Sequence, residues 1–279
     1  MKEIKSWKVI LIWFIVPAAV SIISTLFLLL LNPSQDINGV LASFISFLSM
    51  LLIILMFGKV NSKLVTERYK DLKCKFNIKE IISVTITQIF LSIGLSNLSI
   101  GFMAINDVDK ALISLNDTFS NPTTNIELLL CFVTMVILAP VLEEITFRRV
   151  LFTGLSKRLN FFMASTISSL LFGFGHDILG VFGAIVFGYS CCILYKKYNN
   201  ILIPISVHCL NNLLAAVFVC ISYFNGTLNI PTEYITNYDI KRYFISGSIL
   251  TIITLIIFIK FILKNKKYIK NEKIQNLKV

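Results

Sequence analysis

Long apolar segments separated by short polar or basic stretches dominate this sequence. A helix needs about 20 mostly apolar residues to cross a bilayer. Eight segments approach or exceed that length, and we predict a membrane helix in each. They cover residues 8–31, 38–57, 80–104, 127–152, 160–176, 179–195, 201–223 and 243–263. The pattern predicts an all-α fold, a polytopic transmembrane bundle of about eight helices with a site inside the bundle.

The composition agrees with a membrane protein. Apolar residues make up 56% of the 279 residues, charged residues only 15%, and the mean hydropathy is +0.81. Soluble domains carry about 25% charged residues. The first apolar run, 9–31, is longer than the apolar region of a signal peptide and lacks a clear cleavage site, so we interpret it as a retained helix. The lipid bilayer is therefore an expected partner.

The net charge of +11 raises the question of nucleic-acid binding, but the distribution of the basic residues argues against it. They lie between the apolar runs, as the positive-inside rule requires of a membrane protein. With the N-terminus in the cytoplasm and eight helices, 23 of the 26 Lys and Arg residues fall on the cytoplasmic side. We predict a multi-pass protein of the cell membrane with both termini cytoplasmic. The Ile-, Lys- and Asn-rich composition suggests a bacterial source.

The polar residues that are unusual for membrane helices are concentrated in one part of the chain. We divide the chain into N-terminal helices with a basic cytoplasmic loop (1–124), a core of site-bearing helices (125–222), and an outer loop, last helix and basic tail (223–279). The six cysteines form no CxxC pair, and five lie in apolar runs. We interpret them as small buried side chains and not as metal ligands.

Two adjacent glutamates and an arginine lie within an apolar run long enough to span a bilayer. An ionisable group at the bilayer centre costs roughly 2.5–3.5 kcal/mol, so chains that carry one there usually use it. On a helix, Glu144 and Arg148 are four residues apart and share a face, where they can form an ion pair. Glu143 is turned by about 100° and has Phe147 at the fourth position. Glu143 is therefore the free carboxylate and the candidate general base, unless both glutamates only hold helices together.

The only two histidines lie on later segments. His176 ends the Phe172–His176 stretch, where two glycines let a neighbouring backbone come close. His208 and Asn212 are four residues apart, so they share a helix face and can both donate hydrogen bonds to an oxyanion. Each histidine could instead serve in contacts between helices.

Two prolines precede these residues. Pro140 lies three residues before Glu143 and Pro204 four before His208. Each is predicted to disturb its helix and free a carbonyl group.

These residues form three motifs in order: Glu143-Glu144 with Arg148, Phe172 with His176, and His208 with Asn212. Over residues 125–222 the chain resembles the CPBP intramembrane proteases, which include type II CAAX prenyl endopeptidases, abortive-infection proteins and bacteriocin self-immunity proteins. The resemblance implies an all-helical membrane endopeptidase. Glu143 and His176 would activate water, His208 and Asn212 would stabilise the oxyanion, and Arg148 would hold Glu144. The implied partner is a peptide or membrane-protein substrate.

The resemblance leaves the cofactor open, because the family was long classed with metalloproteases. Two histidines and a glutamate could ligate zinc. The chain has no HExxH motif, and zinc sites usually place ligands more closely on one helix. We therefore expect no cofactor, with zinc as the alternative.

Two other classes of function compete with the endopeptidase. A non-catalytic membrane scaffold or bacteriocin-immunity protein would bind a peptide or a sensor partner and would not need Glu143 as a base. A transporter would be expected to show inverted repeats or paired broken helices, and the sequence shows neither.

Overall fold

The computed structural model describes residues 4–31, 39–75, 77–116 and 121–269. The described residues are helical apart from short connections. The helices are α1 (Ser6–Leu31), α2 (Gly39–Phe57), α3 (Ser62–Lys75), α4 (Ile78–Asn106), α5 (Val108–Asn116), α6 (Asn125–Val133), η1 (Thr134–Leu138), α7 (Ala139–Glu144), η2 (Ile145–Phe152), α8 (Thr153–Ser156), α9 (Phe161–Gly173), α10 (Val181–Tyr198), α11 (Leu202–Phe224), α12 (Asn237–Lys264) and α13 (Lys266–Ile269). The predicted loop 32–37 and the tail residues 270–279 lie outside the described residues.

The prediction of an all-α polytopic bundle is confirmed, and each of the eight predicted segments is helical. Within the described residues, six helical stretches are long and apolar enough to cross a membrane by length and composition: α1, α2, α4, the continuous stretch Asn125–Ser156, α11 and α12. The remaining two predicted segments are α9 and α10. Helix α9 has only 13 residues and ends at Gly173, not at His176 as predicted.

The structure contains helices that hydropathy did not predict. The basic loop between α2 and α4 holds α3, and the outer loop after α4 holds α5. Lys, Arg and Glu residues lower the mean hydropathy of α3, so a search for apolar runs passes over it. Both are short helices between membrane segments and do not change the predicted class of fold.

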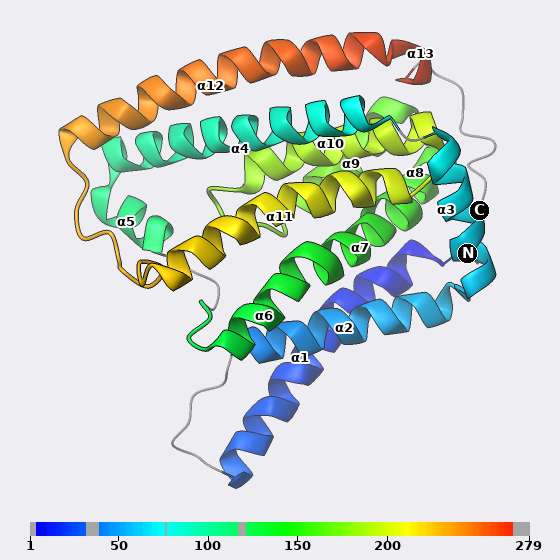
Figure 1. Cartoon of the computed structure of the whole chain (residues 1–279), viewed down its shortest axis with the longest axis horizontal. Coiled ribbons are helices and arrows are strands. Elements are labelled where there is room, and N and C mark those ends of the chain that lie inside the picture. The colour runs from blue at the N-terminus through cyan, green and yellow to red at the C-terminus, as the bar shows by residue number, and fades with distance from the viewer. Residues whose placement is uncertain (1–3, 32–38, 76, 117–120, 270–279) are drawn as a thin grey trace.

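The bundle is built around the helical stretch from α6 to α8 together with α11 (Figure 1). Helix α11 packs against η1 and α7, and α10 packs against both α9 and α4. Helix α12 lies along α4 at one edge, whereas α1 contacts α2 and η2 at the opposite edge. Contacts between these helices join all three of the predicted parts of the chain. The division at residues 124 and 223 therefore stays a prediction.

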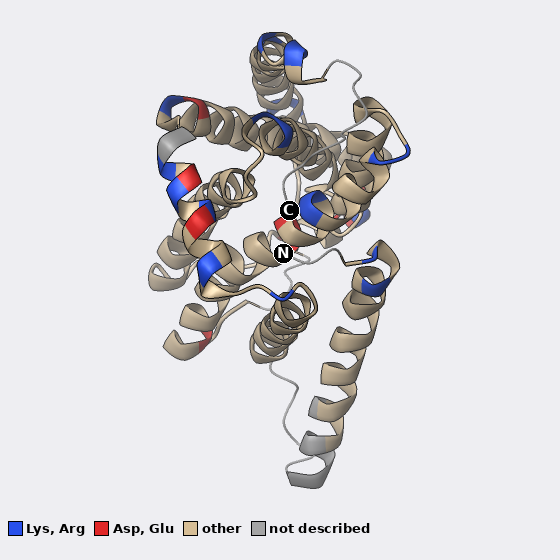
Figure 2. Cartoon of the chain, turned by 90° about the vertical axis from the view of Figure 1, so that its right-hand side faces the viewer, with Lys and Arg blue, Asp and Glu red and all other residues tan. Residues whose placement is uncertain are grey.

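Basic residues gather at one end of the bundle. The start of α1, helix α3 and the end of α12 lie at that end (Figure 1), and Lys and Arg predominate when it faces the viewer (Figure 2). This arrangement agrees with the predicted separation of charge. The orientation of the bundle in the membrane remains a prediction.

The helix that carries the glutamates is interrupted by two π-helical stretches, η1 and η2. Pro140 is the second residue after η1 and cannot donate an N–H to the preceding turn, so the wider turn accommodates it. π-Helical turns are rare and are often found at functional sites. The other proline behaves differently from the prediction: Pro204 lies in the first turn of α11, where no intrahelical N–H bond is lost.

Candidate active site

A buried ion pair lies at the centre of the site. Glu144 Oε1 is 2.9 Å from Arg148 Nη1, and neither side chain is exposed. The predicted pairing of residues four apart is therefore present, even though η2 begins between them. Each charge lowers the cost of burying the other.

The arginine depends on its neighbours from other helices. Its guanidinium lies over the ring of Phe172 at 4.3 Å from the ring centroid, a cation–π geometry. A Cβ atom added to Gly188 of α10 would come within 3.2 Å of Arg148 Nη2 and 3.1 Å of the Ser169 side chain. The glycine leaves room for the buried cation.

His208 joins the ion pair from α11. Its Nδ1 is 2.9 Å from Glu144 Oε1, and the ring is almost fully buried. A carboxylate only accepts hydrogen bonds, so Nδ1 carries the hydrogen. The other ring nitrogen, Nε2, lies 3.7 Å from Glu143 Oε2, which is too long for a direct hydrogen bond. Glu144 thus connects Arg148 and His208, a contact between residues 64 apart in the chain that the motif spacing did not predict.

Glu143 and His176 line one cavity of about 450 Å³. Its walls come from α1, the α7–η2 stretch, the end of α9 and the turn after it. Most of the other lining side chains are apolar or aromatic: Val9, Ile10, Trp13, Phe14, Phe147, Val150, Leu151, Leu171, Phe172 and Phe174. Glu143 therefore lines an open space, whereas Glu144 is fully buried.

His176 lies in the turn between α9 and α10. Its Nδ1 is 3.0 Å from the Phe172 carbonyl oxygen. Because a carbonyl only accepts, Nδ1 donates this bond, and Nε2 of the neutral ring keeps a lone pair. The Phe172 ring packs against both histidines, with centroid distances of 4.7 Å to His176 and 5.8 Å to His208.

Asn212 lies one turn after His208 on α11, as predicted. Its Nδ2 donates to the carbonyl of Met135 in η1 at 2.9 Å, and its Oδ1 accepts a bond from Asn211 at 3.2 Å. The side-chain amide carries a second hydrogen on Nδ2. The predicted role as a donor is therefore compatible with this placement.

Two residues of this region were not predicted from the motifs. Trp13 of α1 donates from Nε1 to Thr146 Oγ1 at 3.1 Å, and its ring packs against Phe47 and Phe147. Trp13 thereby fixes α1 as one wall of the cavity. Only a weak feature of the sequence indicates a role for Trp13: it is one of two tryptophans in the chain and lies within a membrane segment.

The geometry bears on the zinc alternative. In the part of the chain that the structure describes, no three His, Cys, Asp or Glu side chains are grouped as metal ligands would be. The Nδ1 atoms of the two histidines have different partners, and the absence of a cofactor stays a prediction. The five cysteines with described side chains are free, and Cys191 and Cys192 are fully buried.

The chain is similar to known proteins over part of its length. Residues 125–214 match the family described as Type II CAAX prenyl endopeptidase Rce1-like. The chain is 35% identical over 82 residues to "Putative membrane peptidase YdiL" of Bacillus subtilis (strain 168). That match covers 29% of this chain and about a third, 34%, of the relative's length. No solved structure matches the chain significantly.

These matches support a membrane protease at the level of family. The family match over residues 125–214 includes the buried ion pair, both histidines and Asn212. The resemblance predicted from the three motifs is therefore confirmed: residues 125–214 are similar to the Rce1-like family.

Proposed function

We propose that the protein is an intramembrane endopeptidase that hydrolyses a peptide bond of a membrane-associated or secreted peptide. The observation that carries the proposal is the cavity in which Glu143 and His176 face the same space. A general base must reach both the attacking water and the substrate. Of the two glutamates, only Glu143 lines that cavity, because Glu144 is held by Arg148 and His208.

In the proposed reaction, Glu143 takes a proton from a water molecule while the water oxygen attacks the scissile carbonyl carbon. His176 Nε2 accepts a hydrogen bond from the same water and orients it. The tetrahedral oxyanion receives hydrogen bonds from His208 Nε2–H, when the ring carries both hydrogens, and from Asn212 Nδ2–H. Glu143 then passes its proton to the departing amine, and the C–N bond breaks.

The ion pair behind the site gives His208 its orientation. The bond from Nδ1 to Glu144 directs Nε2 toward Glu143. The Glu144–Arg148 pair beside His208 carries no net charge. A neutral cluster costs less to bury than an isolated charge.

The test is the substitution Glu143→Gln, which keeps the size of the side chain and removes the base. The loss of peptide cleavage should correspond to several kcal/mol of transition-state stabilisation, with the melting temperature in detergent almost unchanged. Glu233→Gln, at an exposed position in the loop before α12, is the matched control. The readout is a comparison of membrane-associated peptides in cells that carry each variant.

A second arm of this experiment concerns metal. Purified enzyme should keep its activity after treatment with a chelator, since the proposed reaction uses only protein groups. Loss of activity on chelation and recovery with added zinc would favour a metal-dependent reaction. A Glu143→Gln variant that keeps the full cellular phenotype would favour the scaffold or immunity protein.

A further inference from the structure

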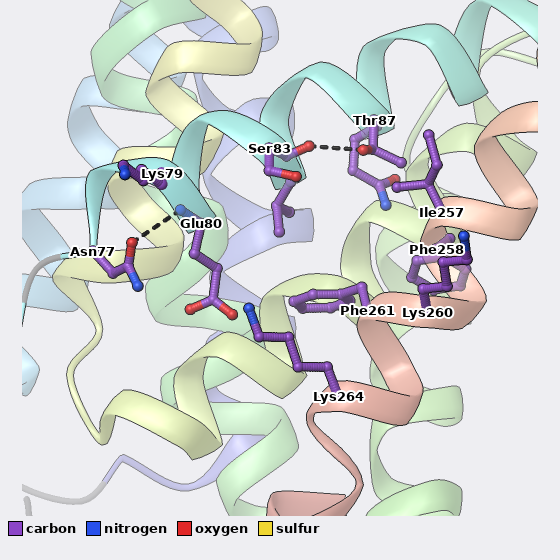
Figure 3. Close-up of a pocket in the computed structure, with 12 residues that line it drawn as sticks. Asn77, Lys79, Glu80, Ser83, Thr87, Ile257, Phe258, Lys260, Phe261 and Lys264 are labelled. Atoms are coloured by element: carbon purple, nitrogen blue, oxygen red, sulfur yellow. Dashed lines mark hydrogen bonds between the residues drawn. The ribbon is translucent and has the colours of Figure 1, made fainter.

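A second cavity of about 450 Å³ lies away from the active site, in a groove between α4 and α12. Figure 3 shows its lining residues. Asn77 and the first turns of α4 form one wall, and the last turns of α12 form the other. The groove lies at the end of the bundle where the basic residues gather (Figure 1).

The groove exists because the two helices touch closely farther along and not here. A Cβ atom on Gly94 would come within 2.8 Å of the Thr251 backbone nitrogen, and one on Gly247 within 3.0 Å of the Gly94 carbonyl oxygen. Toward Ile78 and Lys264 the larger side chains of Phe258 and Phe261 stand between the helices. Helices α4 and α12 therefore pack closely at Gly94 and Gly247 and lie farther apart beside the basic end.

The mouth of the groove is positively charged. Lys79, Lys260 and Lys264 line it, and all three are exposed. None of them forms an ion pair of 4.0 Å or less with a described residue. Asn77 caps the start of α4 by accepting from the Glu80 backbone N–H, so the positive end of the helix dipole also lies here.

One carboxylate lies in the floor of the groove, but it is neutralised. Glu80 is 7% exposed and accepts from Lys197 Nζ at 2.6 and 2.7 Å. Tyr198 donates a further hydrogen bond to it. Lys264 also points toward this carboxylate (Figure 3). Lys197 and Lys264 therefore face this carboxylate, and Lys79 and Lys260 add two further positive charges to the lining, so the groove keeps a net positive charge for an external anion.

Below the charged mouth the α12 wall is apolar, whereas the α4 wall also carries Thr87 and Gln88. Ile257 is exposed on the groove, and Phe258 and Phe261 form its inner side. Ser83 adds an exposed hydroxyl one turn below Lys79. A basic mouth above an apolar wall at the end of two membrane helices fits a molecule with an anionic head and a hydrocarbon chain. A free phosphate ion would use the mouth and leave the apolar wall exposed.

We propose that this groove binds one anionic phospholipid. Its phosphate lies among Lys79, Lys260 and Lys264, and one acyl chain packs against Ile257 and Phe258. Basic pockets between membrane helices bind anionic head groups in this manner. The site is separate from the cavity of Glu143 and His176, and the proposal holds whether or not the protein cuts peptides.

The test uses the full-length protein purified in detergent. Bound lipid is counted by native mass spectrometry during titration with phosphatidylglycerol, and separately with phosphatidylcholine of the same acyl chains. The variant is the triple change Lys79→Gln, Lys260→Gln and Lys264→Gln. The control variant, Lys59→Gln, Lys63→Gln and Lys70→Gln, removes three exposed charges near or on α3 at the same end of the bundle. Melting temperatures without lipid verify that both variants are folded.

The proposal expects one tight phosphatidylglycerol on the wild type and on the control variant. For the groove variant, the half-saturating concentration should rise at least about tenfold. Phosphatidylcholine should bind at least tenfold more weakly than phosphatidylglycerol, and inorganic phosphate should not compete. Equal losses in the two variants would show non-specific attraction to the basic end. Equal binding of the two lipids, or competition by phosphate alone, would also overturn the proposal.

Discussion

At the scale of single residues, Glu143 and Glu144 are neighbours in the chain but have different surroundings. Glu144 contacts Arg148 and His208 and is fully buried, whereas Glu143 lines the cavity. The pairing with Arg148 could be predicted from their spacing, because residues four apart share a helix face. The bond to His208 could not, since local spacing says nothing of which distant helix lies opposite. For the same reason, the hydrogen bond from Trp13 to Thr146 could not be predicted from the sequence.

The first prediction concerns stability at Glu144. The substitution Glu144→Gln leaves Arg148 as an unpaired buried charge and weakens the bond to His208. Breaking a fully buried pair costs about 3–5 kcal/mol of unfolding free energy, so the melting temperature in detergent should fall. Combining Glu144→Gln with Arg148→Met should recover part of that loss, although His208 still lacks its charged acceptor.

Thermal unfolding of the two variants and of Glu143→Gln is the measurement. Glu143→Gln should leave the melting temperature nearly unchanged. If Glu143→Gln lowers it and Glu144→Gln abolishes only cleavage, the roles assigned to the two glutamates are reversed.

At the scale of elements, the apolar runs predicted where eight helices lie, because a membrane helix needs a long stretch without charges. They did not predict α3 and α5, which are too short or too polar to cross a membrane. They also missed the π-helical stretches, because one extra residue in a turn leaves the hydrophobic pattern almost unchanged. The end of α9 was placed three residues too late, since Phe174 keeps the run apolar after the helix has ended.

The second prediction tests the packing of α9 and α10 around Arg148. Gly188→Ala requires the Ser169 side chain and the guanidinium to move by a few tenths of an ångström, because the new Cβ would lie 3.1–3.2 Å from them. Gly188→Val adds two further methyl groups and should destabilise the protein more, by about 1–3 kcal/mol as for other overpacked sites. The measurement is the melting temperature in detergent.

Gly175→Ala is the comparison for this series. A Cβ atom there would meet only the Phe172 carbonyl oxygen at 3.4 Å, an ordinary contact. Its melting temperature should stay close to that of the wild type. A Gly188→Val protein as stable as the wild type would show that the space beside Arg148 is larger than the structure indicates.

At the scale of the whole molecule, the distribution of Lys and Arg predicts which end of the bundle faces the cytoplasm. The structure brings these residues from α3, the turn after α8, the end of α10 and the end of α12 to one end (Figure 2). Positive-inside sorting acts on exactly such short basic loops beside membrane helices. The arrangement of helices around the site was not predictable, because it depends on contacts such as α4 with α12 that join distant parts of the chain.

The third prediction is that this basic end is cytoplasmic. An epitope tag fused after Val279 should be protected from antibody in spheroplasts and become accessible only after the membrane is permeabilised. A tag inserted at Glu233, in the loop between α11 and α12, should be accessible without permeabilisation. The reverse pattern would contradict the predicted orientation, and access to both tags without permeabilisation would contradict a membrane crossing by α12.

The short length of α9 has a consequence for the surrounding bilayer. Its 13 residues span about 20 Å, whereas the hydrocarbon core is about 30 Å thick. The turn that carries His176 is therefore expected to lie within the hydrocarbon depth, where non-helical backbone is tolerated only against protein or a water-filled cavity. A hydrophobic mismatch of this kind is relieved when the membrane becomes thinner next to the protein.

Membrane thickness should therefore control turnover. In vesicles of phosphatidylcholine with short, medium and long acyl chains, cleavage is expected to be fastest in the thinnest bilayer that keeps the protein folded. It should slow as the chains lengthen, because a thicker membrane excludes the water that hydrolysis consumes. Equal rates in all three vesicles would show that water reaches His176 by a path that the protein itself provides.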